Sequence, residues 1–213
     1  MFELCLVTDE KACKGRPLPE VVAAAVKGGV SIVQLREKEL DSRHFLRRAE
    51  LLLEILAPQG IPLIINDRVD IALAISADGV HVGQQDMPIP QVRELLSPYS
   101  IVGLSIENLD QGIAAQSLET TYYGVGPIFT SPTKADAAPA MGLIKLKELR
   151  AQTSRPLMAI GGITIDNARE VIQAGADGLA VVSAICSADD PEESARKLRQ
   201  IVDEELRLRG TKD

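Results

Sequence analysis

The sequence predicts an α/β protein built as a single (β/α)8 TIM barrel, with residues 1–213 forming one domain. Eight short apolar segments alternate with longer amphipathic segments, which indicates parallel strands joined by helical crossovers. A length of 213 residues is sufficient for one such barrel with a sizeable core, and no linker or low-complexity tract divides the chain. A doubly wound open sheet is the alternative arrangement of the same units.

Eight segments have the features of buried strands. Each is short and rich in β-branched residues, and each is bounded by glycine, proline or aspartate. The expected strands cover residues 2–7, 31–36, 62–66, 79–82, 101–105, 122–126, 157–161 and 178–182.

The segments between the strands carry apolar residues at helical spacing. The clearest is 42–56, in which apolar side chains recur every three or four positions from Phe45 to Leu56. Asp41 or Ser42 is the expected N-cap of this helix. The other helices are expected at residues 19–27, 67–75, 90–96, 108–117, 143–152, 166–174 and 191–208.

The composition argues against several classes of partner. The formal net charge is −7 and aromatic residues make up only 3% of the chain, so the sequence lacks both the basic face and the stacking platforms that nucleic acids require. No apolar run is long enough to span a membrane, and the first residues lack the basic region of a secretory signal. We therefore expect a cytoplasmic protein with no nucleic-acid or membrane partner. The three scattered cysteines form no zinc motif and are expected to be reduced thiols.

The carboxyl end of the second expected strand is basic. Active-site residues of (β/α)8 barrels lie at the carboxyl ends of the strands. Gln34, Arg36 and Lys38 are spaced two apart and so point to the same side. An arginine that faces the barrel needs an anionic partner, which is either a substrate or, in a purely structural role, Glu37, Glu39 or an acid from another strand.

Two acidic residues follow the third and fourth expected strands. Asp67 comes directly after Asn66, and Asp86 lies in the loop after residues 79–82. Because neighbouring strands end side by side, we expect these carboxylates to lie near each other, where they suit a Mg²⁺ ion that also binds substrate phosphate. In the structural alternative, Asp67 caps the next helix and Asp86 shapes the turn before Pro88.

The remaining strand ends offer groups that suit phosphate. The fifth strand ends in Ser105, and the loop after the sixth contains Ser131, Thr133 and Lys134, although a surface loop would have similar residues. Gly162 and Ser183 follow the seventh and eighth strands near helix starts, which form the usual phosphate site of this fold.

Neither histidine is expected to act in nucleophilic hydrolysis. His44 is expected at the surface, and His81, in the middle of a strand, is interpreted as a structural histidine. No arrangement of histidine with serine or cysteine and an acid is apparent. The residues instead indicate two anion sites, one beside magnesium. This layout suits two phosphorylated substrates, one of which carries a diphosphate leaving group.

The order and spacing of six motifs resemble the thiamine phosphate synthase family over nearly the whole chain. The motifs are VQLREK (33–38), LIINDRVDIAL (63–73), ADGVHVGQQDMP (77–88), GVGPIFTSPTK (124–134), AIGGI (159–163) and GADGLAVVSAI (175–185). The resemblance implies a transferase of thiamine diphosphate biosynthesis that joins an aminopyrimidine-methyl diphosphate to a thiazole phosphate or its carboxylated form. Thiamine phosphate and pyrophosphate are the implied products. The implied mechanism is dissociative and magnesium-assisted: the diphosphate leaves, and the thiazole nitrogen attacks a pyrimidine-methylene cation.

The resemblance also implies a set of site residues. Substrate contacts on the pyrimidine-diphosphate side are Gln34, Leu35, Arg36, Glu37, Lys38, Asn66, Ser105 and Lys134. Those on the thiazole-phosphate side are Ser131, Pro132, Thr133, Gly162, Val182 and Ser183. Asp67 and Asp86 are the implied Mg²⁺ ligands. Among the contacts, Arg36, Lys38, Ser105 and Lys134 carry the implied catalytic role of stabilising the departing charge.

Three other functions are compatible with parts of this pattern. A thiazole tautomerase of similar fold uses a histidine in the region of the fifth-strand serine, whereas this chain has Ile106 directly after Ser105. A non-catalytic ligand-binding barrel would be suggested by loss of Lys38, Asp67 or Lys134, and all three are present. A sugar-phosphate enzyme would explain the last two loops only. The oligomeric state is open, with a homo-oligomer among the alternatives.

Overall fold

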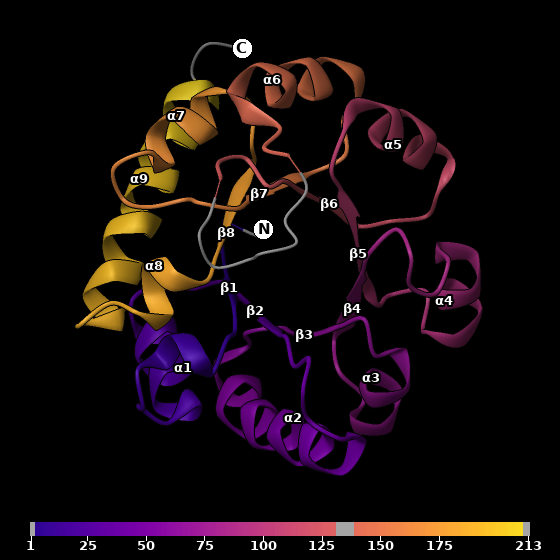
Figure 1. Cartoon of the computed structure of the whole chain (residues 1–213), viewed down its shortest axis with the longest axis vertical. Helices are drawn as coiled ribbons and strands as arrows, with labels where there is room; N and C mark the ends of the chain where they lie inside the picture. Colours follow the sequence, from indigo (N-terminus) through magenta and orange to yellow (C-terminus); the bar gives the residue numbers. More distant parts are fainter. Residues whose placement is uncertain (1–2, 131–138, 211–213) are drawn as a thin grey trace.

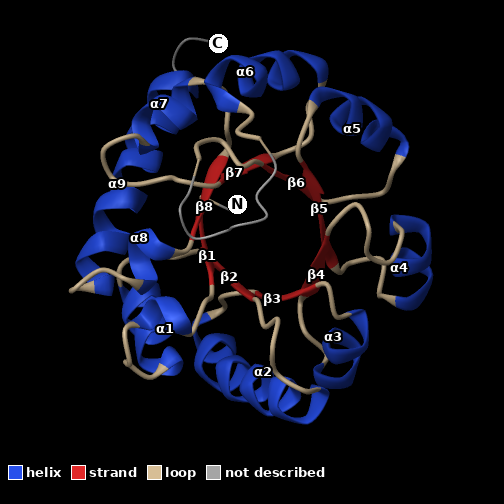
Figure 2. Cartoon of the chain, in the orientation of Figure 1, coloured by secondary structure: helices blue, strands red, loops and turns tan. Residues whose placement is uncertain are grey.

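Eight parallel strands close into a barrel in the order of the sequence. The computed structural model describes residues 3–130 and 139–210. Each strand pairs with its neighbours in sequence, and β8 returns to pair with β1 in parallel. The helices surround the ring of strands (Figures 1 and 2). The predicted (β/α)8 barrel is confirmed, and the doubly wound alternative is wrong because the sheet is closed.

The strands lie close to their expected positions. They are β1 (Leu4–Val7), β2 (Ile32–Leu35), β3 (Leu63–Asn66), β4 (Gly79–Val82), β5 (Ile101–Ile106), β6 (Tyr122–Val125), β7 (Leu157–Ile160) and β8 (Gly178–Val181). The α-helices are α1 (Leu18–Lys27), α2 (Ser42–Leu56), α3 (Val69–Ile75), α4 (Ile89–Leu95), α5 (Leu109–Ala114), α6 (Gly142–Gln152), α7 (Ala168–Gln173), α8 (Ser183–Cys186) and α9 (Pro191–Gly210). Short 3-10 turns cover Lys11–Cys13, Ala57–Gln59 and Ala115–Ser117.

Local chemistry explains where several helices begin and end. Asp41 is the N-cap of α2, because its side chain accepts a hydrogen bond from the His44 backbone N–H at 2.9 Å. Helix α3 begins two residues later than expected, since Asp67 adopts a left-handed backbone with φ of 61°. The helix expected at 108–117 ends at Ala114 and continues as a 3-10 turn. The eighth unit holds two helices, α8 and α9, of which α8 is a single turn.

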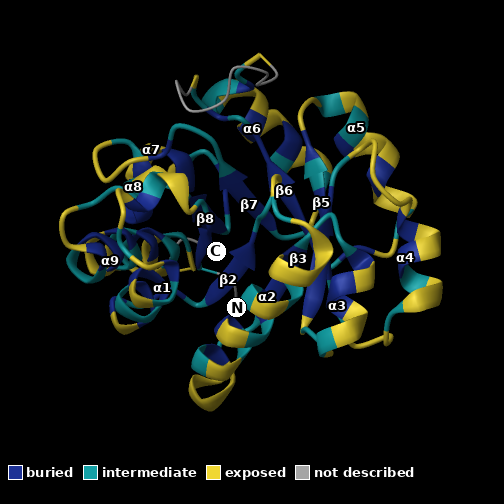
Figure 3. Ribbon diagram, turned by 60° about the horizontal axis from the view of Figure 1, so that its bottom comes forward, coloured by how far each residue is buried: buried dark blue, intermediate teal, exposed yellow. Residues whose placement is uncertain are grey.

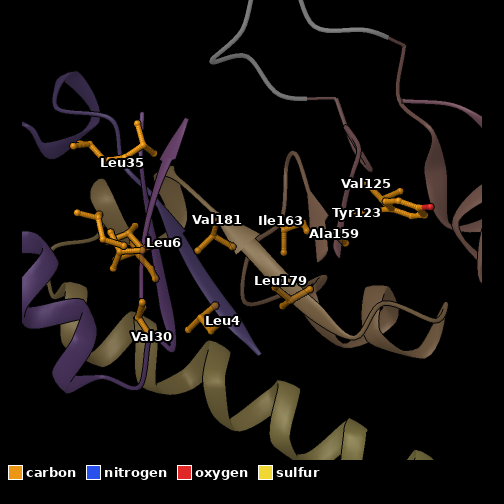
Figure 4. Packing of buried hydrophobic residues seen from close by; sticks show 14 of the residues in the cluster. Leu4, Leu6, Val30, Leu35, Tyr123, Val125, Ala159, Ile163, Leu179 and Val181 are labelled. Carbon is orange, nitrogen blue, oxygen red and sulfur yellow. The ribbon is translucent and has the colours of Figure 1, made fainter. Parts of the chain in front are cut away.

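Alternation along the strands separates two cores. Side chains that point outward pack against the helices in the larger core, and Figure 4 shows Leu4, Leu6, Leu179 and Val181 from the adjacent strands β1 and β8. Side chains that point inward fill the lower barrel with a small apolar cluster: Cys5, Val7, Ile32, Ile64, Tyr122, Met158 and Ala180. The strands are buried, whereas the helices expose their outer faces (Figure 3). The closed floor leaves the carboxyl ends of the strands as the place for chemistry.

Candidate active site

The upper barrel interior is polar, in contrast to its apolar floor. Gln34 on β2 and Asn66 on β3 meet above the floor, and Gln34 Nε2 donates a hydrogen bond to Asn66 Oδ1 at 2.9 Å. Gln34 is buried inside the barrel, as the alternation predicted, while Val33 and Leu35 pack in the outer core. The Leu35 side chain is therefore turned away from the mouth, and only its backbone is available to a ligand there.

Arg36 follows β2 at the mouth of the barrel. Its backbone N–H donates to Thr8 Oγ1 at 3.0 Å, which ties this segment to the end of β1. The structural partners considered for its guanidinium are engaged elsewhere: Glu37 pairs with Arg48 of α2 at 2.5 Å, and Glu39 pairs with Lys11 at 2.5 Å. Within the described part of the chain, the Arg36 guanidinium forms no ion pair. The charge is thus available to an anionic ligand.

Lys38 and Asp67 form an ion pair across the ends of β2 and β3. Lys38 Nζ lies 2.5 Å from Asp67 Oδ2, and 54% of the lysine side chain is exposed against 21% for the aspartate. The Asp67 backbone N–H donates to the His81 carbonyl at 2.8 Å, which fixes the turn after β3. Arg68 occupies the N-cap position of α3, and no side-chain capping hydrogen bond forms at this start of the helix. The alternative in which Asp67 caps this helix is therefore wrong.

Asp86 approaches Asp67 from the loop after β4. Burial raises the pKa of the Asp86 carboxyl, and the neighbouring Asp67 raises it further, while the Gly83 N–H and Lys38 act in the opposite direction. Asp86 Oδ2 also accepts a hydrogen bond from the Gly83 N–H at 2.7 Å, so this residue does shape its own turn. Two neighbouring carboxylates share a single ammonium group here, and a divalent cation would relieve the repulsion between them.

The two carboxylates of Asp67 and Asp86 suit Mg²⁺ better than they suit a metal whose ligands all come from protein side chains. No cluster of three or more histidine, cysteine, aspartate or glutamate side chains able to hold a metal occurs among residues 3–130 and 139–210. Mg²⁺ is commonly bound by one or two carboxylates and completes its coordination with water and substrate phosphate. Asp67 and Asp86 provide that number of carboxylates, at the mouth where a phosphorylated substrate would enter.

Ser105 on β5 completes the described polar rim and stands over a buried histidine. Ser105 Oγ lies 2.9 Å from His81 Nε2, and His81 Nδ1 lies 2.9 Å from the Tyr122 hydroxyl. Gln84, from the loop after β4, donates to the Ser105 carbonyl at 2.5 Å. The sequence interpretation of His81 as a structural residue missed its contact with a candidate site residue. Gly103 on β5 and Gly124 on β6 leave room for an inward-facing ring at His81, and this signal becomes visible only once the strands are paired.

The loops after β7 and β8 form the other side of the mouth. Gly162 has φ of 64°, and a Cβ at this position would lie 2.8 Å from the Phe129 Cβ, so the loop after β7 packs closely on the loop after β6. Val182 borders the inner cluster, and Ser183 is exposed at the start of α8. The other expected contacts in the loop after β6, Ser131, Pro132, Thr133 and Lys134, lie outside the described residues.

The fold and this mouth together define a class of protein. A (β/α)8 barrel with basic, acidic and hydroxyl side chains gathered at the carboxyl ends of its strands has the arrangement of a barrel enzyme. None of the described helices is both long and apolar enough to cross a membrane.

Comparison with known proteins identifies the family. A family model described as thiamine monophosphate synthase matches residues 4–185. A thiamine-phosphate synthase of Albidiferax ferrireducens is 56% identical over 95% of this chain and 92% of its own length. One from Syntrophomonas wolfei is 52% identical over 94% of this chain and 96% of its own. The chain belongs to the thiamine monophosphate synthase family.

Solved structures agree with this assignment. A thiamine phosphate pyrophosphorylase from Pyrococcus furiosus superimposes with a TM-score of 0.88 and 35% identity, covering 96% of this chain and 97% of that one. A 3-hexulose-6-phosphate synthase superimposes with a TM-score of 0.70 at 17% identity, which shows a shared barrel fold and nothing more.

Proposed function

We propose that the protein is a thiamine-phosphate synthase, a transferase that joins an aminopyrimidine-methyl diphosphate to a thiazole phosphate, or its carboxylated form, and releases pyrophosphate. The observation that carries the proposal is the meeting of Arg36, Lys38, Asp67 and Asp86 at one mouth, above the Gln34–Asn66 pair. Family membership over most of the chain supports the same activity.

The diphosphate binds on the β2–β4 side of the mouth. The ammonium of Lys38 lies beside Asp67 and near Asp86, and Arg36 follows β2 at the same mouth, so these two cations and two carboxylates nearly cancel in charge. A diphosphate with several negative charges needs additional positive charge, and the Asp67–Asp86 pair is where Mg²⁺ would bind. A Mg²⁺ ion held by Asp67 and Asp86 would supply charge neutralisation to the diphosphate as a leaving group.

The pyrimidine ring lies deeper, over the apolar floor of the barrel. The amides of Gln34 and Asn66 present hydrogen-bonding groups suited to an aminopyrimidine edge, and Ser105 offers a hydroxyl beside them. The backbone of Leu35 and Glu37 lines the same strand end, while their side chains serve the fold. This arrangement orients the methylene carbon toward the opening of the barrel, where the second substrate enters.

The thiazole phosphate binds on the opposite side, near β7 and β8. Gly162, Val182 and Ser183 bring backbone amides and a hydroxyl to the usual phosphate position of this fold. Ser131, Pro132, Thr133 and Lys134 belong to this proposal on the family resemblance alone, with Lys134 shared between the two anions. The two substrates then meet above the barrel axis.

The reaction proceeds by departure before attack. The bond between the methylene carbon and the diphosphate oxygen breaks with its electron pair on oxygen, and Arg36, Lys38 and Ser105 stabilise the charge that develops. The thiazole nitrogen then donates its lone pair to the pyrimidine-methylene cation and forms the new C–N bond. No side chain is required to remove a proton in this step, which agrees with a mouth that has no exposed histidine among the site residues described above.

The fold disfavours the tautomerase alternative. Ile106 is fully buried in the core between the barrel and the helices, so the position after Ser105 faces away from the barrel interior. The Ile106 side chain also has no group that can transfer a proton, which a tautomerase requires. We also infer a cytoplasmic location from the three buried free thiols, Cys5, Cys13 and Cys186, while a homo-oligomer stays an expectation from the sequence.

Pyrophosphate release provides the test. We expect rapid release from the pyrimidine diphosphate, coupled to thiamine phosphate formation, only when the thiazole phosphate and Mg²⁺ are both present. Each substrate and the metal are omitted in turn as controls. Ligand binding without release under any condition would contradict the synthase and favour a binding protein, and conversion of the thiazole substrate alone would favour a tautomerase.

A further inference from the structure

A column of three polar side chains runs from the mouth into the barrel. Ser105 on β5, His81 on β4 and Tyr122 on β6 are joined by contacts of 2.9 Å at each imidazole nitrogen. Ser105 is partly exposed at the mouth, whereas His81 is 8% exposed and Tyr122 is 3% exposed. The imidazole therefore connects a candidate substrate contact with a hydroxyl that no substrate reaches.

Two glycines on neighbouring strands make room for the imidazole. A Cβ at Gly103 would lie 2.3 Å from His81 Nδ1 and 2.4 Å from Tyr122 Cζ. A Cβ at Gly124 would lie 2.6 Å from His81 Cε1. All three distances are too short for any real contact, so a side chain at either position would clash with the ring or with Tyr122. Residues of β5 and β6, as well as those of β4, therefore determine where the His81 ring lies.

The chemistry of the column favours one direction of hydrogen bonding. Burial raises the pKa of the Tyr122 phenol well above its usual range, and burial raises that of the neighbouring Cys5 thiol to about 12, so both stay protonated. A protonated Tyr122 hydroxyl can donate to His81 Nδ1, and a neutral ring that accepts this bond carries its proton on Nε2. In that arrangement Nε2–H donates to Ser105 Oγ, which directs the serine's own proton away from the imidazole.

We propose that His81 is a positioning residue that holds the Ser105 hydroxyl as a hydrogen-bond donor toward the departing diphosphate, with Tyr122 fixing the tautomer of the ring. This inference rests on the proposed function. No proton changes hands; the column only orients the serine. A donor that is already oriented stabilises developing charge without reorganisation when the bond breaks.

Kinetics of a double-mutant cycle test the inference. His81→Leu is expected to lower kcat for pyrophosphate release roughly 100-fold, the scale of one lost transition-state donor, with KM changed less than about threefold. His81→Gln restores an amide N–H near Nε2 and is expected to recover most of the loss. In a Ser105→Ala background, His81→Leu is expected to have almost no further effect, because the two residues act as one unit. His44→Gln, at the exposed second histidine, is the matched control.

An equal fall in kcat from His81→Leu with and without Ser105 would overturn the inference, since a merely structural role is indifferent to the serine. If His81→Leu does not fold, Tyr122→Phe removes a single oxygen and is run through the same cycle. A smaller loss is expected from it, about tenfold, again absent in the Ser105→Ala background.

Nitrogen-15 NMR of labelled histidine separates this inference from the proposed function. The chain has only two histidines, so the His44→Gln variant assigns the His81 signals. A protonated Nε2 and an unprotonated Nδ1 are expected, whether or not the protein turns over any substrate. The opposite tautomer would overturn the inference even in an active enzyme, and absence of pyrophosphate release with the expected tautomer would count against the proposed function alone.

Discussion

Replacing Lys38 with alanine is expected to lower kcat/KM for the pyrimidine diphosphate at least about 100-fold while the barrel stays folded. The ammonium group stands beside Asp67 at the mouth, and a departing diphosphate gains negative charge as its bond to carbon breaks. A fixed cation at that position stabilises the transition state more than the ground state. Steady-state kinetics with varied pyrimidine diphosphate and saturating thiazole phosphate measure the effect.

Lys11 provides the matched control for this experiment. It also forms a 2.5 Å ion pair with a carboxylate, Glu39, and is not among the proposed substrate contacts. Exposed ion pairs contribute little to stability, so Lys11→Ala is expected to leave the urea midpoint unchanged. Lys38→Ala is expected to lower it only slightly, because Asp67 and Asp86 then lack the ammonium that they share. Unchanged turnover of Lys38→Ala at saturating substrate would remove this residue from the mechanism.

Replacing Asp86 with asparagine is expected to raise the Mg²⁺ concentration for half-maximal activity at least about tenfold. The asparagine oxygen can still accept the Gly83 N–H, so the turn keeps its hydrogen bond while the negative charge is lost. Magnesium titrations of pyrophosphate release measure the shift. Asp70→Asn is the control, because Asp70 is an exposed carboxylate paired with Arg68 only three residues from Asp67.

The same variant has a second readout in the absence of metal. Asp67 raises the pKa of Asp86, which indicates that the two carboxylates repel each other. Removing one charge is therefore expected to raise Tm slightly in magnesium-free buffer, and added Mg²⁺ is expected to stabilise the wild type more than Asp86→Asn. An unaltered magnesium dependence of activity, together with a lowered Tm, would show that Asp86 only stabilises the turn after β4 and does not bind the metal.

Local patterns were sufficient to predict much of the fold and part of the site. Each of the eight apolar segments forms a strand, because short runs of β-branched residues bounded by turn residues favour strands. Alternation correctly placed Gln34 inside the barrel and Val33 outside it. The order of parallel strands also brought Asp67 and Asp86 together, since sequential strands of a barrel end side by side.

Features that depend on contacts between distant segments were not predicted. His81 is polar in the middle of a strand, and nothing local reveals that it meets Ser105 and Tyr122 from the next two strands. Cys13 and Cys186 are far apart in sequence, yet their thiols lie within hydrogen-bonding reach in the outer core. The packing of the closed barrel determines which of these side chains come into contact.

Side chains within one motif of the family resemblance point in different directions. Within VQLREK, the alternation places Gln34 in the barrel, while Leu35 packs on the helices and Glu37 pairs with Arg48. Leu35 and Glu37 can therefore contact a ligand only through their backbone atoms, while their side chains stabilise the surrounding fold. A family motif identifies the segment, and the strand geometry determines which of its side chains reach the mouth.

A crystal structure with Mn²⁺ in place of Mg²⁺ and with bound pyrophosphate would locate the metal and the diphosphate in the barrel mouth. We expect an anomalous metal peak between the carboxylates of Asp67 and Asp86, with pyrophosphate oxygens on that metal and on the side chains of Arg36 and Lys38. Metal bound elsewhere, or pyrophosphate seated only near Gly162 and Ser183, would contradict the assignment of the diphosphate to the β2–β4 side of the barrel.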